Sequence, residues 1–178
     1  MKLYVARHGQ SIYNLLKLNN AEPATHVPLS KKGEREASKL ADDLSDVAFS
    51  VIYVSELKRT QQTAKIINEF HKVKIRVDRR LNDNKTGFEG KTYDEYNEEL
   101  ESKSDMWNAH LNGGESIMDV NLRVKNFLDD LSRDQSKTVL IVTSLMIIQQ
   151  IESIVYGYRQ EKVAKFIYET GTYHIYNI

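Results

Sequence analysis

The feature that most constrains the fold of this chain is a continuous run of β-branched and aliphatic residues, Val-Leu-Ile-Val, at positions 139–142. Such a run suits a central strand of a parallel sheet, because helices cover both faces of that strand. Shorter apolar runs of strand character lie at residues 3–5, 49–54 and 73–77, and apolar residues recur at helical spacing between them. This alternation predicts an α/β fold, a three-layer α/β/α sandwich with a mainly parallel central sheet.

The same patterns divide the chain into elements. Helices are predicted at residues 11–19, 31–44, 56–70, 92–100, 115–131 and 145–156. Ser30 is a plausible N-cap for the second of them, and residues 78–92 are expected to be loop. The tail is predicted to form two strands, at 163–167 and 173–178, joined around Gly171. With 178 residues and neither a repeat nor a linker, a single domain over residues 1–178 is expected.

Composition limits what the chain is expected to bind. Lys and Arg number 25 in total, as do Asp and Glu, so the formal net charge is zero. This balance argues against broad binding to nucleic acid or to an anionic membrane. The sequence has no cysteine, which excludes disulfides and cysteine-based zinc sites. No segment approaches the roughly 20 apolar residues of a membrane span, and none resembles a signal peptide, so cytoplasmic residence is expected.

The first candidate site is Arg7-His8-Gly9, which follows a predicted strand and precedes a predicted helix. An arginine and a helix N-terminus at a strand tip are suited to holding a phosphate group. A histidine in that place is suited to attack phosphorus as a nucleophile. On its own the motif is short, and a lone histidine after a strand is more often structural.

Further motifs follow in order. They are Ser11 and Asn14 at helical offsets from His8, Pro-Leu-Ser-Lys-Lys-Gly-Glu-Arg-Glu-Ala at 28–37, Ser-Glu-Leu-Lys-Arg-Thr-Gln-Gln-Thr-Ala at 55–64, Leu-Asn-Asp at 81–83, Gly-Phe-Glu-Gly at 87–90 and Gly-Gly-Glu-Ser at 113–116. Taken together, they resemble the histidine phosphatase superfamily, also called the phosphoglycerate mutase-like family. The resemblance covers essentially the whole chain. It implies action on a small phosphorylated substrate through a phosphohistidine, without a metal or an organic cofactor.

The resemblance also implies roles for individual residues. His8 is the expected nucleophile, and Arg7 and Arg59 are expected to hold the phosphate with guanidinium forks. His8 must be neutral, so its second ring nitrogen is expected to donate to a backbone carbonyl. Gly9 is expected to let the chain turn beneath the substrate, and Ser11 and Asn14 to form the helical wall of the pocket.

Two positions in the sequence compete for the acid that protonates the leaving group. The family usually has a Glu two residues after a Leu, and here Asp83 follows Leu81 at that spacing. In the family this Glu precedes a stretch like Gly-x-x-x-Glu-Gly. If that stretch is matched to Glu89-Gly90 without a gap, the acid position falls on Asn82 instead. If one residue is deleted between Gly87 and Phe88, the acid position falls on Asp83 again. Asp83 is preferred because an amide is a poor proton donor. A third reading treats residues 82–84 as simple turn residues.

The clearest departure from the family is at Ser144. The family has an apolar strand, then Ser or Thr, then His-Gly, whereas this chain has Thr143-Ser144-Leu145-Met146. Losing one donor to the transition state commonly costs on the order of 10²–10³ in rate. Of the other histidines, His71 and His174 are expected to be structural, and His26 and His110 to reach the pocket rim at most. No two histidines are spaced to bind a metal.

The sequence therefore predicts a phosphomonoesterase weakened at Ser144. One alternative is a pseudophosphatase that binds a phosphorylated ligand; weaker alternatives are a mutase-like phosphotransferase and a partner-binding scaffold. Changes at three consecutive positions, 144–146, favour natural drift, although a deliberate change of one residue at Ser144 is also compatible with the sequence. The substrate and the oligomeric state are not predicted.

Overall fold

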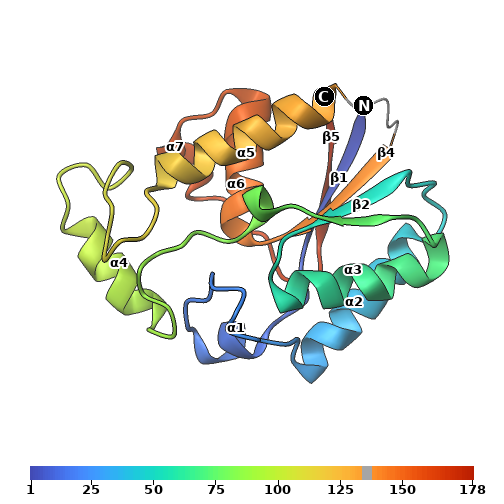
Figure 1. Cartoon of the computed structure of the whole chain (residues 1–178), viewed down its shortest axis with the longest axis horizontal. Helices are drawn as coiled ribbons and strands as arrows, with labels where there is room; N and C mark the ends of the chain where they lie inside the picture. Colours follow the sequence, from blue (N-terminus) through green and yellow to red (C-terminus); the bar gives the residue numbers. More distant parts are fainter. Residues whose placement is uncertain (134–137) are drawn as a thin grey trace.

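The computed structural model describes residues 1–133 and 138–178. Its strands are β1 (Lys2–Arg7), β2 (Val51–Val54), β3 (Ile75–Val77), β4 (Thr138–Thr143) and β5 (Tyr173–Asn177). The sheet has the order β3-β2-β4-β1-β5 (Figure 1). The pairs β1–β4, β2–β4 and β2–β3 are parallel, whereas β5 runs antiparallel to β1. The predicted mainly parallel sheet is thus confirmed, with the 139–142 run in its central strand.

Helices cover both faces of this sheet. The first face carries α2 (Lys31–Leu44) and α3 (Lys58–His71), and the second carries α5 (Ile117–Ser132) and α6 (Leu145–Tyr156). Alternate residues of one strand supply the two cores: in β4, Leu140 and Val142 pack towards α2 and α3, whereas Val139 and Ile141 pack towards α5 and α6. The three-layer α/β/α architecture is confirmed, and β4 is buried on both sides because each layer contacts it.

Two further helices lie beyond the carboxyl ends of the parallel strands. They are α1 (Ile12–Leu16) and α4 (Tyr93–Glu101), which Figure 1 shows towards the bottom and the left of the view. The two segments are joined by an isolated antiparallel bridge between Leu18 and Thr92. A 3₁₀ turn, η1 (Arg79–Leu81), follows β3 and leads into the segment that carries Asp83.

Helix α1 is shorter than the predicted 11–19 helix. It ends at Leu16 because Lys17 adopts the left-handed conformation, with φ of 56°. The chain then turns towards α4, where the amide of Asn19 donates to the carbonyl of Lys91 at 2.8 Å. Tertiary contacts therefore end the helix before its local sequence pattern does.

The predicted strand at residues 163–167 is wrong. The chain forms a short helix, α7 (Gln160–Val163), followed by turns, and β5 is the only part of the tail in the sheet. Phe166 packs edge-on against the rings of Tyr158 and Tyr168, and its carbonyl accepts from the amide of Gln149 at 2.9 Å. Ring contacts and a side-chain hydrogen bond thus replace the expected backbone pairing.

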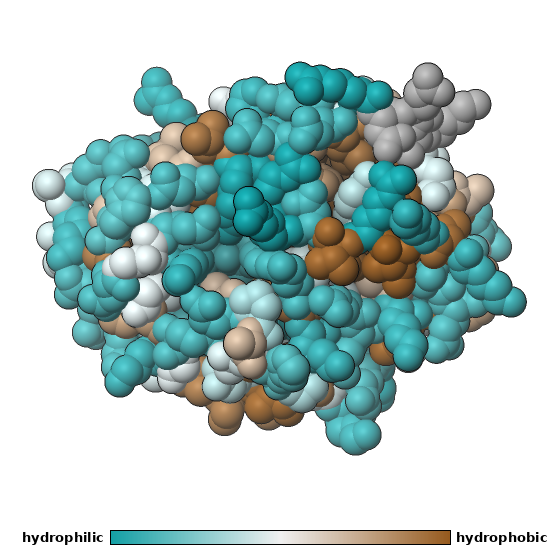
Figure 2. Space-filling view, in the orientation of Figure 1, coloured by the Kyte–Doolittle hydropathy of each residue, from teal (hydrophilic) through white to brown (hydrophobic). Residues whose placement is uncertain are grey.

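Within the described residues, none of the helices combines the length and the apolar character needed to cross a bilayer. Figure 2 shows that the face viewed in Figure 1 is mainly hydrophilic, with hydrophobic side chains in separate small areas. Residence in the cytoplasm stays a prediction from the sequence.

Candidate active site

A pocket of about 270 Å³ opens at the carboxyl ends of β1 and β4. The two strand ends are paired, since Arg7 lies opposite Thr143, and the amide of His8 donates to the Thr143 carbonyl at 2.9 Å. Seven of the predicted site residues line this pocket: Arg7, His8, Ser11, Asn14, Arg59, Asp83 and Ser144. The sheet topology therefore brings together segments that are up to 137 positions apart in the sequence, from Arg7 to Ser144.

His8 is almost completely buried, at 1% exposure. Its Nδ1 lies 2.7 Å from the carbonyl oxygen of Gly9, so Nδ1 carries the proton and donates it to that oxygen. Nε2 is therefore unprotonated and has a lone pair. That lone pair accepts from Nε of Arg59 at 3.0 Å. Burial and the charge of Arg59 hold the pKa of His8 well below its usual range. The imidazole is therefore neutral near pH 7, as a nitrogen nucleophile must be.

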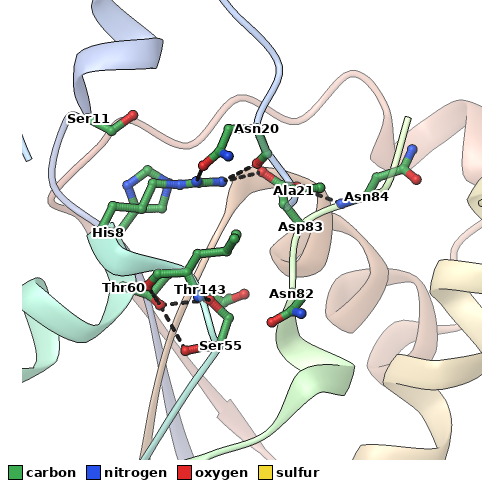
Figure 3. A network of polar contacts seen from close by, with 12 residues as sticks. His8, Ser11, Asn20, Ala21, Ser55, Thr60, Asn82, Asp83, Asn84 and Thr143 are labelled. Carbon is green, nitrogen blue, oxygen red and sulfur yellow. Dashed lines mark hydrogen bonds and ion pairs between the residues drawn. The ribbon is translucent and has the colours of Figure 1, made fainter. Parts of the chain in front are cut away.

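Arg59 connects the two sides of the pocket, because its guanidinium contacts His8, Asn20 and Asp83, which are labelled in Figure 3. Besides its bond to His8, its Nη1 donates to Oδ1 of Asn20, and its Nη2 donates to the Asn20 carbonyl at 2.9 Å and to Oδ2 of Asp83 at 3.0 Å. Its exposed fraction is only 3%. The side chain therefore turns inward from the start of α3.

The start of α3 holds Arg59 in that direction. The hydroxyl of Thr60 donates to the carbonyl of Leu57 at 2.8 Å and lies 2.7 Å from Oγ of Ser55. One turn later, Oγ1 of Thr63 donates to the Arg59 carbonyl at 2.9 Å and accepts from the amide of Gly9 at 3.1 Å. The hydroxyls of the 55–64 motif thus tie the helix that carries the arginine to the loop that carries the histidine.

Arg7 lies at the end of β1 and is held from one side only. Its Nη1 donates to the carbonyl oxygen of Tyr168, whereas its buried Nε has no hydrogen-bond partner among the described residues. Burial is the main cause that lowers the pKa of Arg7, although the group stays cationic near pH 7. A guanidinium with an unused donor at a pocket wall is suited to bind an oxyanion.

The structure separates the two candidates for the acid. Asp83 lines the pocket and contacts Arg59, whereas Asn82 turns its side chain away towards Glu56 (Figure 3). Oδ1 of Asn82 accepts from the Glu56 amide at 2.8 Å, and its Nδ2 donates to Oε2 of Glu56 at 2.7 Å. The segment before them is fixed to β4, because Oγ1 of Thr143 donates to the Leu81 carbonyl at 2.9 Å.

Ser11 and Asn14 form a capping box at the start of α1. Asn14 accepts at Oδ1 from the amide and the hydroxyl of Ser11, both at 3.0 Å, and its Nδ2 donates to Oη of Tyr93 at 3.0 Å. Gly9 does not line the pocket. A Cβ there would lie 2.2 Å from the carbonyl oxygen of Gly33, so the glycine permits close packing of two loops.

Ser144 is the N-cap residue of α6, but its hydroxyl makes no cap hydrogen bond. The buried Oγ has no hydrogen-bond partner in the described part of the chain. Leu145 and Met146, which follow it, also line the pocket, so the N-terminus of α6 faces the same space as Arg7 and His8. A free hydroxyl and a helix N-terminus at one wall are suited to receive an anion.

His8 is the one histidine among the described lining residues. His110 is exposed and pairs through Nε2 with Oδ2 of Asp119 at 2.6 Å, and the ring of His174 packs on that of Tyr168 at 4.4 Å. His71 is the last residue of α3, and its ring packs against that of Phe49 with 4.8 Å between the ring centroids. His26 is exposed. No second imidazole therefore reaches the pocket from the described residues.

Three residues that contribute to the site escaped the sequence analysis: Asn20, Tyr93 and Tyr168. Asn20 lies in a loop without periodicity, so no local pattern singles it out. Tyr168 acts through its backbone carbonyl, to which side-chain identity gives no clue. Tyr93 carries a weak signal, because it follows Thr92, the N-cap at the start of the helix predicted at residues 92–100.

Several curated proteins are similar in sequence to this chain. A fructose-2,6-bisphosphatase (TIGAR) of Xenopus tropicalis is 34% identical over 137 residues, which are 74% of this chain and 50% of that protein. Phosphoserine phosphatase 1 of Hydrogenobacter thermophilus is 28% identical over 182 residues, 98% of this chain and 85% of that protein. The match to the fructose-2,6-bisphosphatase of Saccharomyces cerevisiae is 30% identical and covers 90% of this chain but 35% of that protein.

Solved structures share the fold. The alpha-ribazole phosphatase of Shigella flexneri superposes with a TM-score of 0.88 at 24% identity, covering 100% of this chain and 91% of that one. A protein of Bacillus stearothermophilus, YhfR, gives a TM-score of 0.84 at 27% identity, covering 98% and 89%. The family model of the histidine phosphatase superfamily (branch 1) matches residues 3–178. The chain belongs to the histidine phosphatase superfamily.

Proposed function

We propose that this protein hydrolyses phosphate monoesters through a phosphohistidine on His8. One observation carries the proposal: the buried guanidinium of Arg59 contacts Nε2 of His8 and Oδ2 of Asp83 at the same time, at 3.0 Å each. A phosphate bound at Arg59 therefore has a nitrogen nucleophile and a carboxyl group beside it. Curated relatives with phosphatase names support the same reaction class.

Binding of the substrate uses the two guanidiniums. Arg7 offers its unpartnered Nε, and Arg59 moves its Nε–H from His8 to a phosphate oxygen, which frees the Nε2 lone pair. The phosphate also replaces Asp83 as the anion next to Arg59, which frees that carboxyl group to turn towards the leaving oxygen. The guanidiniums of Arg7 and Arg59 then face the phosphate dianion of the substrate.

The transfer occurs in two balanced steps. In the first, Nε2 of His8 forms a bond to phosphorus, the ester P–O bond breaks, and Asp83 gives its proton to the leaving oxygen. In the second, Asp83 takes a proton from water, the water oxygen attacks phosphorus, and the P–N bond breaks to release phosphate. The bond from Nδ1 to the Gly9 carbonyl keeps the imidazole oriented through both steps.

Ser144 and the first turn of α6 take the place of the second histidine in this scheme. The free hydroxyl and the helix N-terminus donate to the equatorial phosphoryl oxygens as charge develops. These groups carry less charge than an imidazolium, so we expect slower turnover than in a site with two histidines. The proposal needs no metal or organic cofactor, and it treats residues 1–178 as one catalytic domain.

The second candidate is a pseudophosphatase that binds a phosphorylated ligand without turnover. The observation in its favour is Ser144, because Arg7 and Arg59 suffice for binding, whereas catalysis needs further donors. A mutase-like phosphotransferase is a weaker candidate, supported by relatives such as the probable phosphoglycerate mutase GpmB of Erwinia tasmaniensis, which is 26% identical over 168 residues.

A single-turnover assay with p-nitrophenyl phosphate tests the proposal. We expect one equivalent of acid-labile, alkali-stable phosphate on the protein, and its loss in His8→Ala. His110→Ala is the matched control, because that histidine is exposed and lies outside the pocket. Vanadate binding without labelling or turnover would support the pseudophosphatase, and labelling that survives in His8→Ala would overturn the role of His8.

A further inference from the structure

The pocket offers charge for one anionic group only. Arg7, Arg59 and Asp83 are its charged side chains in the described part of the chain, since His8 is neutral there. One phosphate dianion uses both guanidiniums. A second phosphate or a carboxylate on the same ester would enter a pocket whose remaining described lining is uncharged.

Lys85 does not change this balance. Lys85 lies between two lining residues, Asn84 and Thr86, but it is not part of the lining itself. Its ammonium group pairs with Oε1 of Glu22 at 3.2 Å, and its side chain is 57% exposed. Recruiting it for a second anion would break that ion pair.

Three tyrosine rings form part of the pocket wall. Tyr13 comes from α1, and Tyr93 and Tyr96 come from α4; all three are half-buried and line the pocket. Oη of Tyr93 accepts from Asn14 at 3.0 Å, and Oη of Tyr96 accepts from Nδ2 of Asn84 at 3.2 Å. These bonds fix two of the rings before a ligand arrives, and fixed aromatic rings favour contact with another ring.

The rest of the lining is apolar or neutral and polar. Leu18, Leu145 and Met146 supply apolar surface, and several amide side chains supply hydrogen-bonding groups. Oδ1 of Asn84 is buried without a partner among the described residues, so it is free to accept from a hydroxyl or an N–H group of the ligand. At about 270 Å³, the cavity is close to the lower end of ligand pockets, roughly 300–1,000 Å³, and suits one compact ester.

We infer that the pocket selects monophosphate esters of uncharged alcohols that carry a ring, and rejects esters with a second anionic group. The inference rests on the proposed function, because it names the substrate class of the same site. Its basis is the placement of three tyrosines and neutral amides around a cradle with two cations.

Steady-state hydrolysis of five esters tests this inference. Benzyl phosphate and adenosine 5′-monophosphate carry uncharged ring-bearing alcohols, ethyl phosphate lacks the ring, and fructose 2,6-bisphosphate and 3-phosphoglycerate add a second anion. We expect kcat/KM for benzyl phosphate to exceed that for ethyl phosphate by roughly fivefold or more, as aromatic contacts allow. The two esters with a second anion should be the poorest substrates.

Variants assign the preference to the tyrosine wall. Tyr93→Leu removes the ring, and we expect KM for benzyl phosphate to rise roughly fivefold while KM for ethyl phosphate changes little. Tyr93→Phe keeps the ring and should retain the preference. Tyr156→Leu is the matched control, because Tyr156 is 51% exposed on α6 and lies outside the pocket lining.

A gain-of-function variant tests the charge argument from the other side. Asn97→Lys adds a third cation at an exposed position of the pocket wall, and we expect it to raise kcat/KM for 3-phosphoglycerate roughly tenfold. If the parent protein prefers fructose 2,6-bisphosphate or 3-phosphoglycerate over benzyl phosphate, the inference is overturned while the proposed function stands. If no ester is turned over and His8 is not labelled, the proposed function fails first; vanadate displacement by benzyl phosphate but not by 3-phosphoglycerate would then still support the binding preference.

Discussion

Arg59 is the residue on which the site is built. A buried guanidinium is costly unless its donors are satisfied, and here two oxygens of Asn20, the carboxylate of Asp83 and the imidazole of His8 satisfy them. The arrangement is also poised for exchange, since an incoming phosphate offers oxygens to the same donors. Asp83 is 28% exposed at its side chain, so it has room to release the arginine and turn towards a leaving group.

Replacing Asp83 distinguishes a proton donor from a structural partner. We expect Asp83→Asn to lower kcat for benzyl phosphate by roughly 10²–10⁴, because the leaving alkoxide then lacks its acid. Hydrolysis of p-nitrophenyl phosphate should fall much less, since that leaving group departs without a proton. Steady-state kinetics with the two substrates measures the difference.

Asn82→Ala is the matched control for that experiment. Asn82 contacts Glu56 and lies outside the pocket, so its loss should leave both rates within about twofold of the parent. If Asn82→Ala lowers the two rates more than Asp83→Asn does, the acid position of the family falls on residue 82, as the ungapped match to Glu89-Gly90 implies.

Ser144 gives a prediction in which stability and activity change in opposite directions. Its buried hydroxyl has no partner, so Ser144→Ala removes an unsatisfied polar group and should leave the free energy of unfolding unchanged or raise it by about 1 kcal/mol. If the hydroxyl donates to the transferring phosphoryl group, kcat should fall roughly tenfold or more. Urea denaturation and steady-state kinetics on one preparation measure both effects.

The reverse substitution restores an imidazole. We expect Ser144→His to raise turnover, and Ser144→His with Leu145→Gly to raise it further, because Leu145 narrows the space into which the ring must enter. His8→Ala should abolish turnover in every background. Variants that stay inactive throughout would instead place the defect at Asp83 or elsewhere in the pocket.

At the scale of elements, the sequence predicts best where one element buries one face. Ser30 and the apolar stripe of α2 define that helix almost to the residue, because capping and amphipathic spacing are both local. Residues 163–167 show the opposite case. Their alternation resembles a strand, yet Ile167 is 79% exposed and Phe166 is held by Gln149, a contact that no local pattern encodes.

Helix α4 is attached to the rest of the protein more weakly than α5. Leu100 is its one buried residue, whereas α5 buries six. We therefore expect amide hydrogens of Tyr93–Glu101 to exchange faster than those of Ile117–Ser132, and vanadate together with benzyl alcohol to slow them, because Tyr93 and Tyr96 line the pocket. Hydrogen exchange with mass spectrometry measures this, and equal protection of the two helices would contradict it.

At the scale of the whole molecule, the site depends on order in the sheet rather than on order in the sequence. The strand order β3-β2-β4-β1-β5 places the ends of β1 and β4 side by side, which is why Arg7, His8 and Ser144 meet. The motifs allowed these residues to be predicted, since each sits at a strand end or a helix start. Asn20 and the Tyr168 carbonyl were beyond prediction, because loops that cross the pocket placed them there.

The histidines give the molecule a predictable response to acid. Burial lowers the pKa values of His8, His71 and His174, so below about pH 6.5 the unfolded chain binds protons that the folded protein does not. Stability is therefore fully present above that pH and declines as the pH falls towards the lowered pKa values. For His8 alone, the loss between pH 6.5 and 5.5 is about 1 kcal/mol.

Urea denaturation at pH 7.5, 6.5 and 5.5 measures this decline. The midpoint should fall across the series with an unchanged slope, well before the carboxylates of Asp78 and Asp119, whose pKa values are lowered by hydrogen bonds, lose their charge below about pH 4. His8→Gln should flatten the dependence, whereas His110→Gln should not, because His110 is exposed and paired with Asp119. A midpoint that does not change from pH 7.5 to 5.5 would contradict the lowered pKa of His8, because the folded and unfolded states would then bind the same number of protons.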